Sequence, residues 1–347
     1  MNNRVGSIVA IVALLATFAV AGATASPRSS RAPELALGWL APTPADGKAF
    51  VVEVGAPLSV SIAATPNAVV TARGLPAGAS LRNTPDGLVL KWVPTAAGVG
   101  PHVVVLSGHK PGTQLYTPSR TLFLYGAPAR TTAGTSQTTV LATPGISRWA
   151  YVIRPAVVRS QPSTSAHVVA RLSTETLDKT PNLVLTLAST KDAAGRTWYQ
   201  VRLPVLPNNS TGWVLWGALD YLKISRTYLV VDRALFVATL YRNGVPIFKT
   251  RVGVGRPYWP TPRGDFYVRE VLTGFTDPMY GPIAFGTSAR SSVLTDWHGG
   301  GGVIGIHGTD QPEILPGRVS HGCVRMPNAS VRRLYRLMGV GTPVAIR

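Results

Sequence analysis

The chain of 347 residues contains a single cysteine, Cys323, and two of its six histidines stand close to it in the sequence. His321 precedes Cys323 by two residues and His307 by sixteen. A lone cysteine cannot form an intramolecular disulfide, and one accompanied by histidines is a candidate catalytic nucleophile. Only about 3% of a free thiol is ionised at pH 7, so an imidazole that accepts its proton would activate it. The pattern therefore predicts a thiol enzyme with a histidine base.

The residues around Cys323 suit the stabilisation of an oxyanion. An extended backbone places His321 and Cys323 on one face, because alternate side chains of a strand point the same way. Gly322 between them lets the main chain approach a substrate closely and offer N–H groups to a negatively charged oxygen. His307 is far enough away in the sequence for a loop to return it to the sulfur. Nucleophilic attack on a carbonyl group is the chemistry that these residues favour.

Two short segments carry a family resemblance. Residues 306–310 (Ile-His-Gly-Thr-Asp) and 320–326 (Ser-His-Gly-Cys-Val-Arg-Met) resemble the signature of the L,D-transpeptidase (YkuD-type) catalytic domain family. Further matches at 261–266 and 341–346 extend the resemblance over about the last third of the chain, residues 226–347. The resemblance implies a β-rich fold that acylates its cysteine with a peptidoglycan stem peptide and passes the acyl group to an amine. It also implies acylation by carbapenems.

The resemblance assigns roles to the residues of the two segments. It makes Cys323 the nucleophile and His307 the general base. It gives His321 and Gly322 the shaping of the oxyanion hole, and Ser320 the support of the loop that carries them.

Three further residues are expected to meet the substrate. Arg325 matches a position where the family carries a basic or amide side chain, and its planar donor fork suits a stem-peptide carboxylate. The alternative for Arg325 is a structural ion pair that closes the loop. Thr309 follows His307 and is expected near the substrate or as a residue that orients the imidazole. Tyr280 lies in a long connection, residues 273–284, and loops of this length in compact domains are more often functional than idle.

A metal site is the structural alternative for the same residues. His298, His307, His321 and Cys323 supply four ligands of the kinds that zinc prefers. The chain has no C-x-x-C pair, however, and the family signature accounts for three of the four residues without a metal. We therefore expect neither a metal nor a cofactor, and we expect His298 to be a polar loop residue.

The sequence predicts a mainly β, multidomain protein. Alternating apolar residues between Gly/Pro turns predict a β-sandwich at 46–126, which resembles Ig-like or cadherin-like modules. Five short apolar segments predict a small barrel at 149–224, which resembles a bacterial SH3-like domain. A spacer at 26–45 and a linker at 127–148 separate these modules, and the catalytic domain occupies 225–347.

Local signals inside the catalytic segment predict a hairpin and a helix. Asn243 and Gly244 together are a strong signal for a two-residue hairpin turn. The short C-terminal helix is expected to begin at Asn328 as its N-cap and to stop at Gly339. Its apolar stripe consists of Val331, Leu334, Tyr335 and Met338.

The start of the chain predicts export. Arg4 precedes an apolar run at 8–21, and Ala-Thr-Ala at 23–25 matches a cleavage site, so residues 1–25 form a predicted signal peptide. The run has fourteen residues, fewer than the ~20 that a membrane-spanning helix needs. An uncleaved anchor is the alternative. We expect a secreted protein at the cell wall or facing the periplasm, with no stable membrane span after cleavage.

The charge of the chain points to an anionic environment. Thirty-four Lys and Arg against fifteen Asp and Glu give a formal charge of +19, and +18 without residues 1–25. Anionic cell-wall polymers are therefore expected partners. Nucleic acid is not, because the basic residues are scattered and do not cluster with stacking aromatics. The alternative is that the charge serves solubility alone.

Several functions remain open at this stage. The resemblance favours cross-linking of diaminopimelate residues with a tetrapeptide stem as donor, while the acceptor can be a second stem, a lipoprotein amine or water. Water as the acceptor would make the protein an L,D-carboxypeptidase. A sortase-like acyltransferase lacks support because the Thr-x-Thr-Cys strand end is absent. The intact pair of His307 and Cys323 argues against a non-catalytic wall-binding protein.

Overall fold

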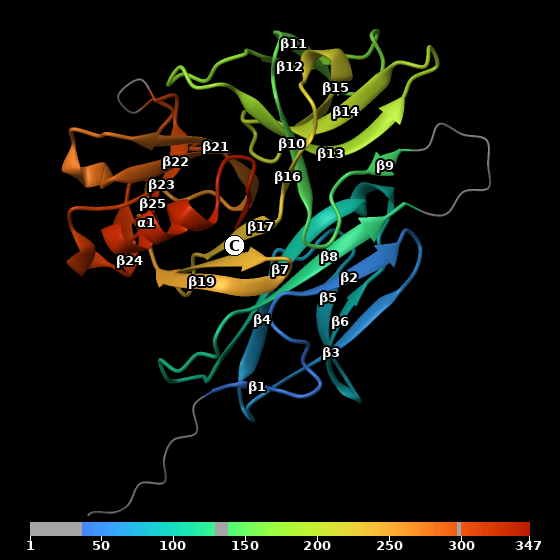
Figure 1. Cartoon of the computed structure of the whole chain (residues 1–347). Coiled ribbons are helices and arrows are strands. Elements are labelled where there is room, and N and C mark those ends of the chain that lie inside the picture. The colour runs from blue at the N-terminus through green and yellow to red at the C-terminus, as the bar shows by residue number, and fades with distance from the viewer. Residues whose placement is uncertain (1–36, 129–137, 297–299) are drawn as a thin grey trace, which may run out of the picture. The chain divides into compact units, whose positions relative to one another are not determined.

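The computed structural model describes residues 37–128, 138–296 and 300–347, and this part of the protein is mainly β, with one short α-helix. Its strands form two sheets of four strands, one of eight and one of ten (Figure 1). The predicted mainly β fold class is confirmed. The predicted signal peptide and His298 lie outside the described residues. Within the described residues, no helix has both the length and the apolar character that crossing a membrane requires.

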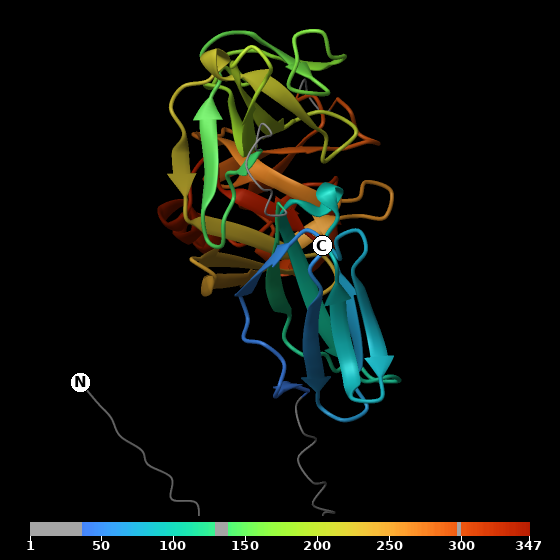
Figure 2. The same cartoon turned by 90° about the vertical axis from the view of Figure 1, so that its right-hand side faces the viewer.

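The first two sheets pack on each other as a sandwich, drawn in blue to green in Figures 1 and 2. Leu90 and Trp92 of one sheet and Leu106 and Leu122 of the other are buried between them. A 3-10 helix, η1 (Ala96–Gly98), lies between β6 and β7. One sheet has the order β1 (Trp39–Leu40), β3 (Leu58–Ala64), β6 (Gly87–Trp92), β5 (Ser80–Thr84), and the other β2 (Lys48–Glu53), β8 (Arg120–Ala127), β7 (Gly100–His109), β4 (Val69–Arg73). The two sheets pack as a β-sandwich, as predicted, and the likeness to Ig-like or cadherin-like modules stays a prediction.

The eight-stranded sheet, called the middle sheet below, follows in the chain. Trp198 is 1% exposed and donates its Nε1–H to Asp192 Oδ2 at 2.9 Å, so it is a core residue of this sheet. A 3-10 helix, η2 (Trp216–Ala218), precedes the last strand. The strand order is β12 (Val168–Leu172), β11 (Ala156–Arg159), β15 (Thr211–Leu215), β14 (Thr197–Arg202), β13 (Leu183–Lys191), β10 (Ser147–Tyr151), β16 (Lys223–Ser225), and β9 (Thr139–Val140) pairs with β13.

The ten-stranded sheet, called the catalytic sheet below, contains both segments of the family signature. Helix α1 (Asn328–Leu337) packs on it through Val331 and Leu334, which are fully buried in a core with Phe285 and Ile306. Two 3-10 helices, η3 (Pro278–Tyr280) and η4 (Pro312–Ile314), lie in its connections. The order is β19 (Val245–Arg251), β18 (Val237–Arg242), β17 (Thr227–Asp232), β26 (Pro343–Ile346), β21 (Gly264–Thr273), β22 (Ile283–Arg290), β23 (Val303–His307), β25 (Val324–Arg325), β20 (Gly253–Gly255), β24 (Gly317–Ser320).

The local predictions for this segment hold with two corrections. Arg242 pairs with Val245 across the two residues Asn243 and Gly244, whose φ angles of 51° and 79° are those of a type I′ hairpin turn. In α1 the predicted stripe is buried except for Tyr335, which is 49% exposed. The predicted N-cap is wrong, because Pro327 occupies that position and the side chain of Asn328 is used elsewhere.

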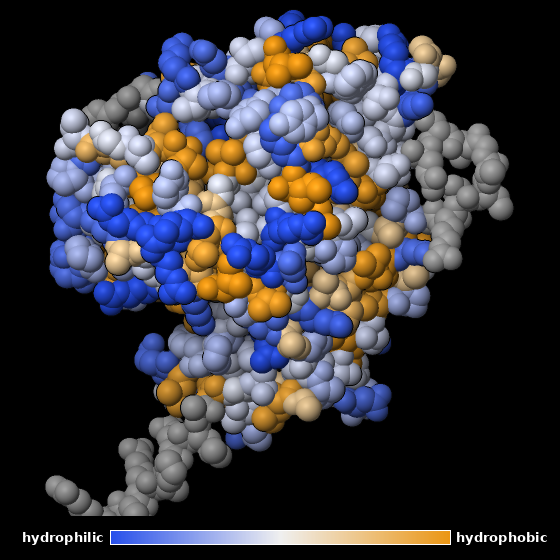
Figure 3. Space-filling view, in the orientation of Figure 1, coloured by the Kyte–Doolittle hydropathy of each residue, from blue (hydrophilic) through white to orange (hydrophobic). Residues whose placement is uncertain are grey.

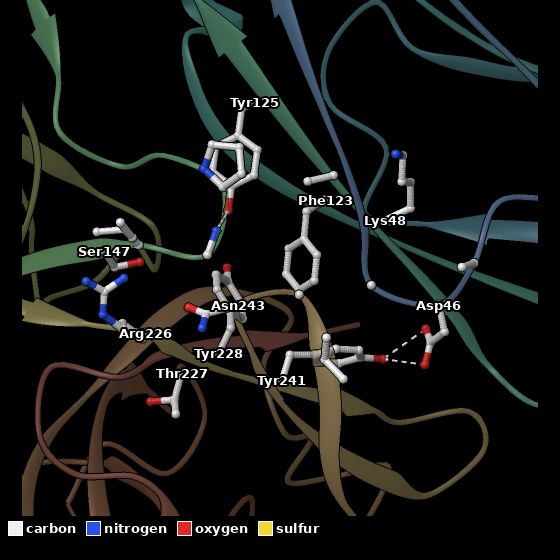
Figure 4. A pocket seen from close by; sticks show the side chains of 18 residues that line it. Asp46, Lys48, Phe123, Tyr125, Ser147, Arg226, Thr227, Tyr228, Tyr241 and Asn243 are labelled. Atoms are coloured by element: carbon white, nitrogen blue, oxygen red, sulfur yellow. Dashed lines mark hydrogen bonds between the residues drawn. The ribbon is translucent and has the colours of Figure 1, made fainter.

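The sandwich packs against the β17–β18 region of the catalytic sheet. Arg73 Nη2 forms an ion pair with Asp232 Oδ2 at 2.6 Å. A cavity of about 370 Å³ lies at this junction (Figure 4). In it Tyr241 donates its hydroxyl to the Asp46 carboxylate, at 3.1 Å from each oxygen, and Gly145 N donates to Tyr125 at 3.4 Å. Burial raises the pKa of Tyr125 to about 12, so this phenol stays protonated at neutral pH.

The middle sheet packs on the other side of the catalytic segment, against β21 and β22. Tyr267 of β21 is fully buried among Trp149, Leu183 and Leu185, and it donates its hydroxyl to the Leu183 carbonyl at 3.2 Å. The segments that precede the catalytic domain in the sequence are therefore joined to it by buried apolar and polar contacts.

Candidate active site

A cleft of about 290 Å³ opens beside Cys323. Strands β21, β22 and β23, the η3 connection, and the loop from Ser320 to Arg325 each contribute to its lining. Six of the eight predicted site residues line it: Cys323, His307, His321, Ser320 and Arg325, with Tyr280 from η3.

The Cys323 thiol lies above the β23 strand. Its sulfur accepts a hydrogen bond from the Gly305 N–H at 3.3 Å, and the residue is partly exposed to the cleft. Burial of the sulfur raises the pKa of Cys323, while the Gly305 N–H and the positive charge of Arg325 act in the opposite direction. The resting side chain is therefore a neutral thiol.

His307 is placed by the end of β23 and is 2% exposed. Its Nδ1 lies 2.7 Å from the Gly308 carbonyl oxygen, so this nitrogen carries the proton that it donates, and Nε2 is left as the basic nitrogen. Burial lowers the pKa of His307 to about 4, with the nearby Arg325 acting in the same direction. The imidazole is neutral at pH 7 and can accept a proton.

Gly305 keeps the space between these two side chains open. A Cβ at position 305 would lie 3.7 Å from Cys323 Sγ and 3.7 Å from His307 Cδ2. Thiol and imidazole thus border the same small volume, although no hydrogen bond between them is found among the described residues. Such contacts often tighten only when substrate binds.

The loop before Cys323 is held by its own hydrogen bonds. Ser320 is fully buried, donates its hydroxyl to the Cys323 carbonyl at 2.6 Å, and accepts the Gly322 N–H at 3.1 Å. Thr261 donates its hydroxyl to the Gly322 carbonyl at 2.7 Å. The two hydrogen bonds of Ser320 are those expected of a residue that supports the loop carrying Cys323. The Gly322 N–H, however, is engaged by Ser320 and does not face the cleft as a free oxyanion donor.

His321 lies on the cleft side of the same loop. Its ring is 4.5 Å from the ring of Trp259, at an interplanar angle of 59°. Partial burial lowers the pKa of His321, and the charges of Arg256 and Arg325 add to this effect. A second neutral imidazole therefore lines the cleft that holds the thiol.

Arg325 of β25 and Tyr280 of η3 both line the cleft. Arg325 is 8% exposed, its Nε has no hydrogen-bond partner, and none of the ion pairs in the described part of the chain includes it. The alternative of a structural ion pair is thus not supported, and a buried guanidinium in a cleft is suited to an anionic ligand. The ring of Tyr280 lies 5.2 Å from those of His307 and Phe275.

The structure does not bring Thr309 to the cleft. Thr309 is 1% exposed, and its hydroxyl accepts the Gln311 N–H at 3.1 Å. Its own N–H donates to Asn328 Oδ1 at 3.0 Å, so Asn328 ties the loop after His307 to helix α1. Sequence reasoning treated Asn328 as a cap, because Asn is a common residue at helix starts whatever its side chain contacts.

Two acidic residues of the cleft were not predicted. Glu270 of β21 and Asp178, from the connection between β12 and β13 of the middle sheet, both belong to its lining. A glutamate within the apolar strand Gly264–Thr273 was the available signal, since glutamate is seldom fully buried without a partner. No local pattern marks Asp178. Among the described residues, no three His, Cys, Asp or Glu side chains gather as a metal site.

Fold and site together define a β-rich catalytic domain with a thiol and a neutral imidazole in one cleft. Residues 226–346 match the family of the L,D-transpeptidase catalytic domain, YkuD. This part of the chain is therefore a YkuD-type L,D-transpeptidase catalytic domain.

Two curated relatives and one solved structure are similar to this part of the chain. "Putative L,D-transpeptidase YqjB" of Bacillus subtilis is 33% identical over 106 residues, which are 27% of this chain and 56% of that protein. "Putative L,D-transpeptidase YkuD" of Bacillus licheniformis is 36% identical over 97 residues, 27% of this chain and 50% of that protein. The chain thus spans about half the length of these relatives. The catalytic domain of the Enterococcus faecium L,D-transpeptidase is 28% identical, with 35% of this chain and 96% of that chain covered and a TM-score of 0.27.

Proposed function

We propose that the protein is an exported peptidoglycan L,D-transpeptidase that works through a thioester on Cys323. The observation that carries the proposal is the common volume above Gly305, which is bordered by the Cys323 thiol and by an imidazole, His307, that is neutral at pH 7. The YkuD-type domain supplies the reaction class. The donor is a tetrapeptide stem, cleaved after its diaminopimelate residue.

The first half of the reaction forms the acyl-enzyme. The thiol of Cys323 gives its proton to Nε2 of His307 as the sulfur attacks the carbonyl carbon of the peptide bond before the terminal D-alanine. N–H groups of the loop stabilise the oxyanion, and because Gly322 donates to Ser320, this role falls to the Cys323 N–H. His307 then returns its proton to the amine of the leaving D-alanine, and a thioester remains.

The second half transfers the acyl group to an amine. A neutral amine of an acceptor stem attacks the thioester carbon, the C–S bond breaks, and the proton released by the amine restores the thiol through His307. An acceptor held close to the thioester gains a large effective molarity over water. Transfer to water would instead give an L,D-carboxypeptidase, and transfer to a lipoprotein amine would attach that protein to the wall.

Arg325 is proposed to hold a carboxylate of the stem peptide. Its guanidinium is buried in the cleft without an ionic partner among the described residues, and such groups form strong charge-assisted hydrogen bonds to carboxylates. Tyr280, whose ring stands beside His307, is proposed to cover the acyl group.

The proposed place of action is the cell wall. The formal charge of +19 favours anionic wall polymers as partners. Part of this charge stands on α1, where Arg332, Arg333 and Arg336 are exposed, and Figure 3 shows hydrophilic side chains gathered over the region of α1.

Incubation of the full chain with disaccharide-tetrapeptide tests the proposal. We expect a dimer cross-linked between two diaminopimelate residues, released D-alanine, and some tripeptide from hydrolysis, all resolved by mass spectrometry. Cys323→Ala should give none of these products. Tripeptide alone would indicate the carboxypeptidase, and consumption of pentapeptide with tetrapeptide untouched would refute the substrate assignment. The same assay on intact sacculi over a salt series tests the charge, because diffuse attraction is screened at high ionic strength.

A further inference from the structure

The Glu270 carboxylate is buried in the lining of the cleft. It is 3% exposed, and its Oε2 accepts the hydroxyl groups of Thr176 at 2.6 Å and Thr180 at 2.7 Å. Both threonines belong to the middle sheet's connection between β12 and β13. A register shift between Val268 and Glu270 places a β-bulge just before it, a device that re-aims side chains.

A row of opposed residues connects Glu270 with the thiol. Glu270 of β21 pairs with Gly286 of β22, and Gly286 pairs with Gly305 of β23. A Cβ on Gly286 would lie 2.7 Å from Glu270 Oε1, and one on Gly305 would lie 3.7 Å from Cys323 Sγ. Since opposed Cβ positions are about 5 Å apart, carboxylate and sulfur stand within about 12 Å of each other. Neither glycine places a side chain of its own between the carboxylate and the sulfur.

Asp178 adds a second carboxyl group to this end of the cleft. It lies in the same connection as the two threonines and lines the cleft. Partial burial raises the pKa of Asp178, and the charge of Glu270 and a hydrogen bond to it add to the rise, while Arg269 acts against it. No ion pair within 4 Å joins Asp178 or Glu270 to a cation of the described residues.

The same cleft holds an unpaired cation. Arg325 is 8% exposed, lines the cleft, and has an Nε without a partner among the described residues. A ligand that satisfied both features would carry an anionic and a cationic group. Acyl transfer between amino-acid side chains supplies such ligands, because the attacking amine arrives from solution as an ammonium group.

We propose that Glu270 and Asp178 form the subsite that binds the ammonium group of the acceptor. This inference rests on the proposed transpeptidase function and adds to it the group that selects an amine over water. The position across the two glycines suits an acceptor that gives a proton to one of these carboxylates and then reaches the thioester carbon as a neutral amine. The middle sheet, which supplies Asp178 and the two threonines, is thereby part of the active site.

The test separates acylation from transfer in the full-length chain. Disaccharide-tetrapeptide serves as the donor, disaccharide-tripeptide, which lacks the terminal D-alanine, as the acceptor, and hydroxylamine, mostly uncharged at neutral pH, as a second nucleophile. For Glu270→Gln and Asp178→Asn we expect about tenfold more tripeptide to be needed for half-maximal cross-linking, the effect of one lost charge-assisted hydrogen bond. Release of D-alanine and transfer to hydroxylamine should stay within about twofold of the wild type.

Matched controls keep the outcomes distinct. Glu175→Gln removes an exposed carboxylate of the same connection, which only approaches Lys179 at 4.0 Å, and should leave all three readouts unchanged. Equal losses with both nucleophiles would make Glu270 and Asp178 structural, and an unchanged tripeptide dependence would overturn the subsite while the transpeptidase stands. A wild-type chain that forms neither thioester nor cross-link would overturn the proposed function, and the subsite with it.

Discussion

Cys323 and His307 form a neutral pair in the resting protein, which bears on how the thiol becomes a nucleophile. Burial raises the pKa of Cys323 and lowers that of His307, so the ion pair of thiolate and imidazolium is disfavoured before substrate arrives. The charge of Arg325 favours the thiolate but opposes the imidazolium. A substrate carboxylate that paired with Arg325 would offset that opposition. Proton transfer is thus expected to accompany attack on the bound substrate.

The pH dependence of acylation follows from the lowered pKa of His307. The imidazole must be neutral to accept the thiol proton, so the rate of acylation by a carbapenem should hold as the pH falls from 7 and decline only toward about 4. Intact-mass measurement of the adduct over a pH series checks this. His307→Ala should acylate about 10²–10⁴-fold more slowly and show no decline at that pH. A decline centred near the ordinary histidine pKa of 6.5 in the wild type would contradict the buried neutral base.

The lowered pKa of His307 also makes the free energy of unfolding depend on pH. Between pH 6.5 and about 4 the unfolded chain binds a proton at His307 and the folded chain does not. The contribution of this group to the free energy of unfolding is therefore present above pH 6.5 and decreases as the pH falls through this window.

At the scale of elements, α1 holds the loop that follows His307. The Asn328 side chain, at the first turn of the helix, accepts the Thr309 N–H at 3.0 Å. It also fills the space beside Gly281 and Gly308, where an added Cβ would lie 2.3 and 2.1 Å from its Oδ1. The amide side chain of Asn328 therefore joins helix α1 to the η3 connection and to the loop after His307.

Removing this amide should loosen the site and destabilise the fold. Asn328→Ala leaves the buried Thr309 N–H without its acceptor, and we expect a loss of about 1–3 kcal/mol in the free energy of unfolding. Acylation should slow as well, because the loop no longer fixes His307. Denaturant unfolding and the acylation rate measure the two effects. Asn328→Asp keeps an acceptor oxygen and serves as the control. If the aspartate variant lost as much as the alanine variant, the hydrogen bond would not be the cause.

Features that depend on residues close together in the sequence could be predicted. The Asn243-Gly244 turn demands positive φ at both residues, and the burial of Val331 and Leu334 follows from helical spacing alone. The meeting of Glu270 with Asp178 could not be predicted, since these residues are far apart in the chain and come together only when the middle sheet packs on β21. Thr309 was expected near the substrate because it follows His307, but its side chain turns into the loop and away from the cleft.

The whole described chain contributes to the stability of the site. The described residues, from Leu37 to Arg347, belong to one compact unit, and the apolar contacts continue from the sandwich into the catalytic sheet. Tyr267, Val230 and Ala345 are buried by segments that precede the catalytic domain or by contacts with them. A chain reduced to 225–347 would expose these residues, so we expect the catalytic domain to depend on its neighbours.

A destabilising substitution in the sandwich should therefore also lower the denaturant concentration at which Cys323 becomes exposed. Phe123 is 4% exposed, and its ring lies 5.2 Å from that of Tyr228 and 5.4 Å from that of Tyr241. Phe123→Ala should cost about 3–5 kcal/mol, because it leaves a cavity at the junction. Denaturant unfolding is followed by circular dichroism and by the reaction of Cys323 with a thiol dye, and both midpoints should fall together. Val51→Ala, at a residue 62% exposed, should leave both almost unchanged. A dye midpoint that stayed at its wild-type value while circular dichroism showed an earlier transition would mean that the sandwich unfolds alone.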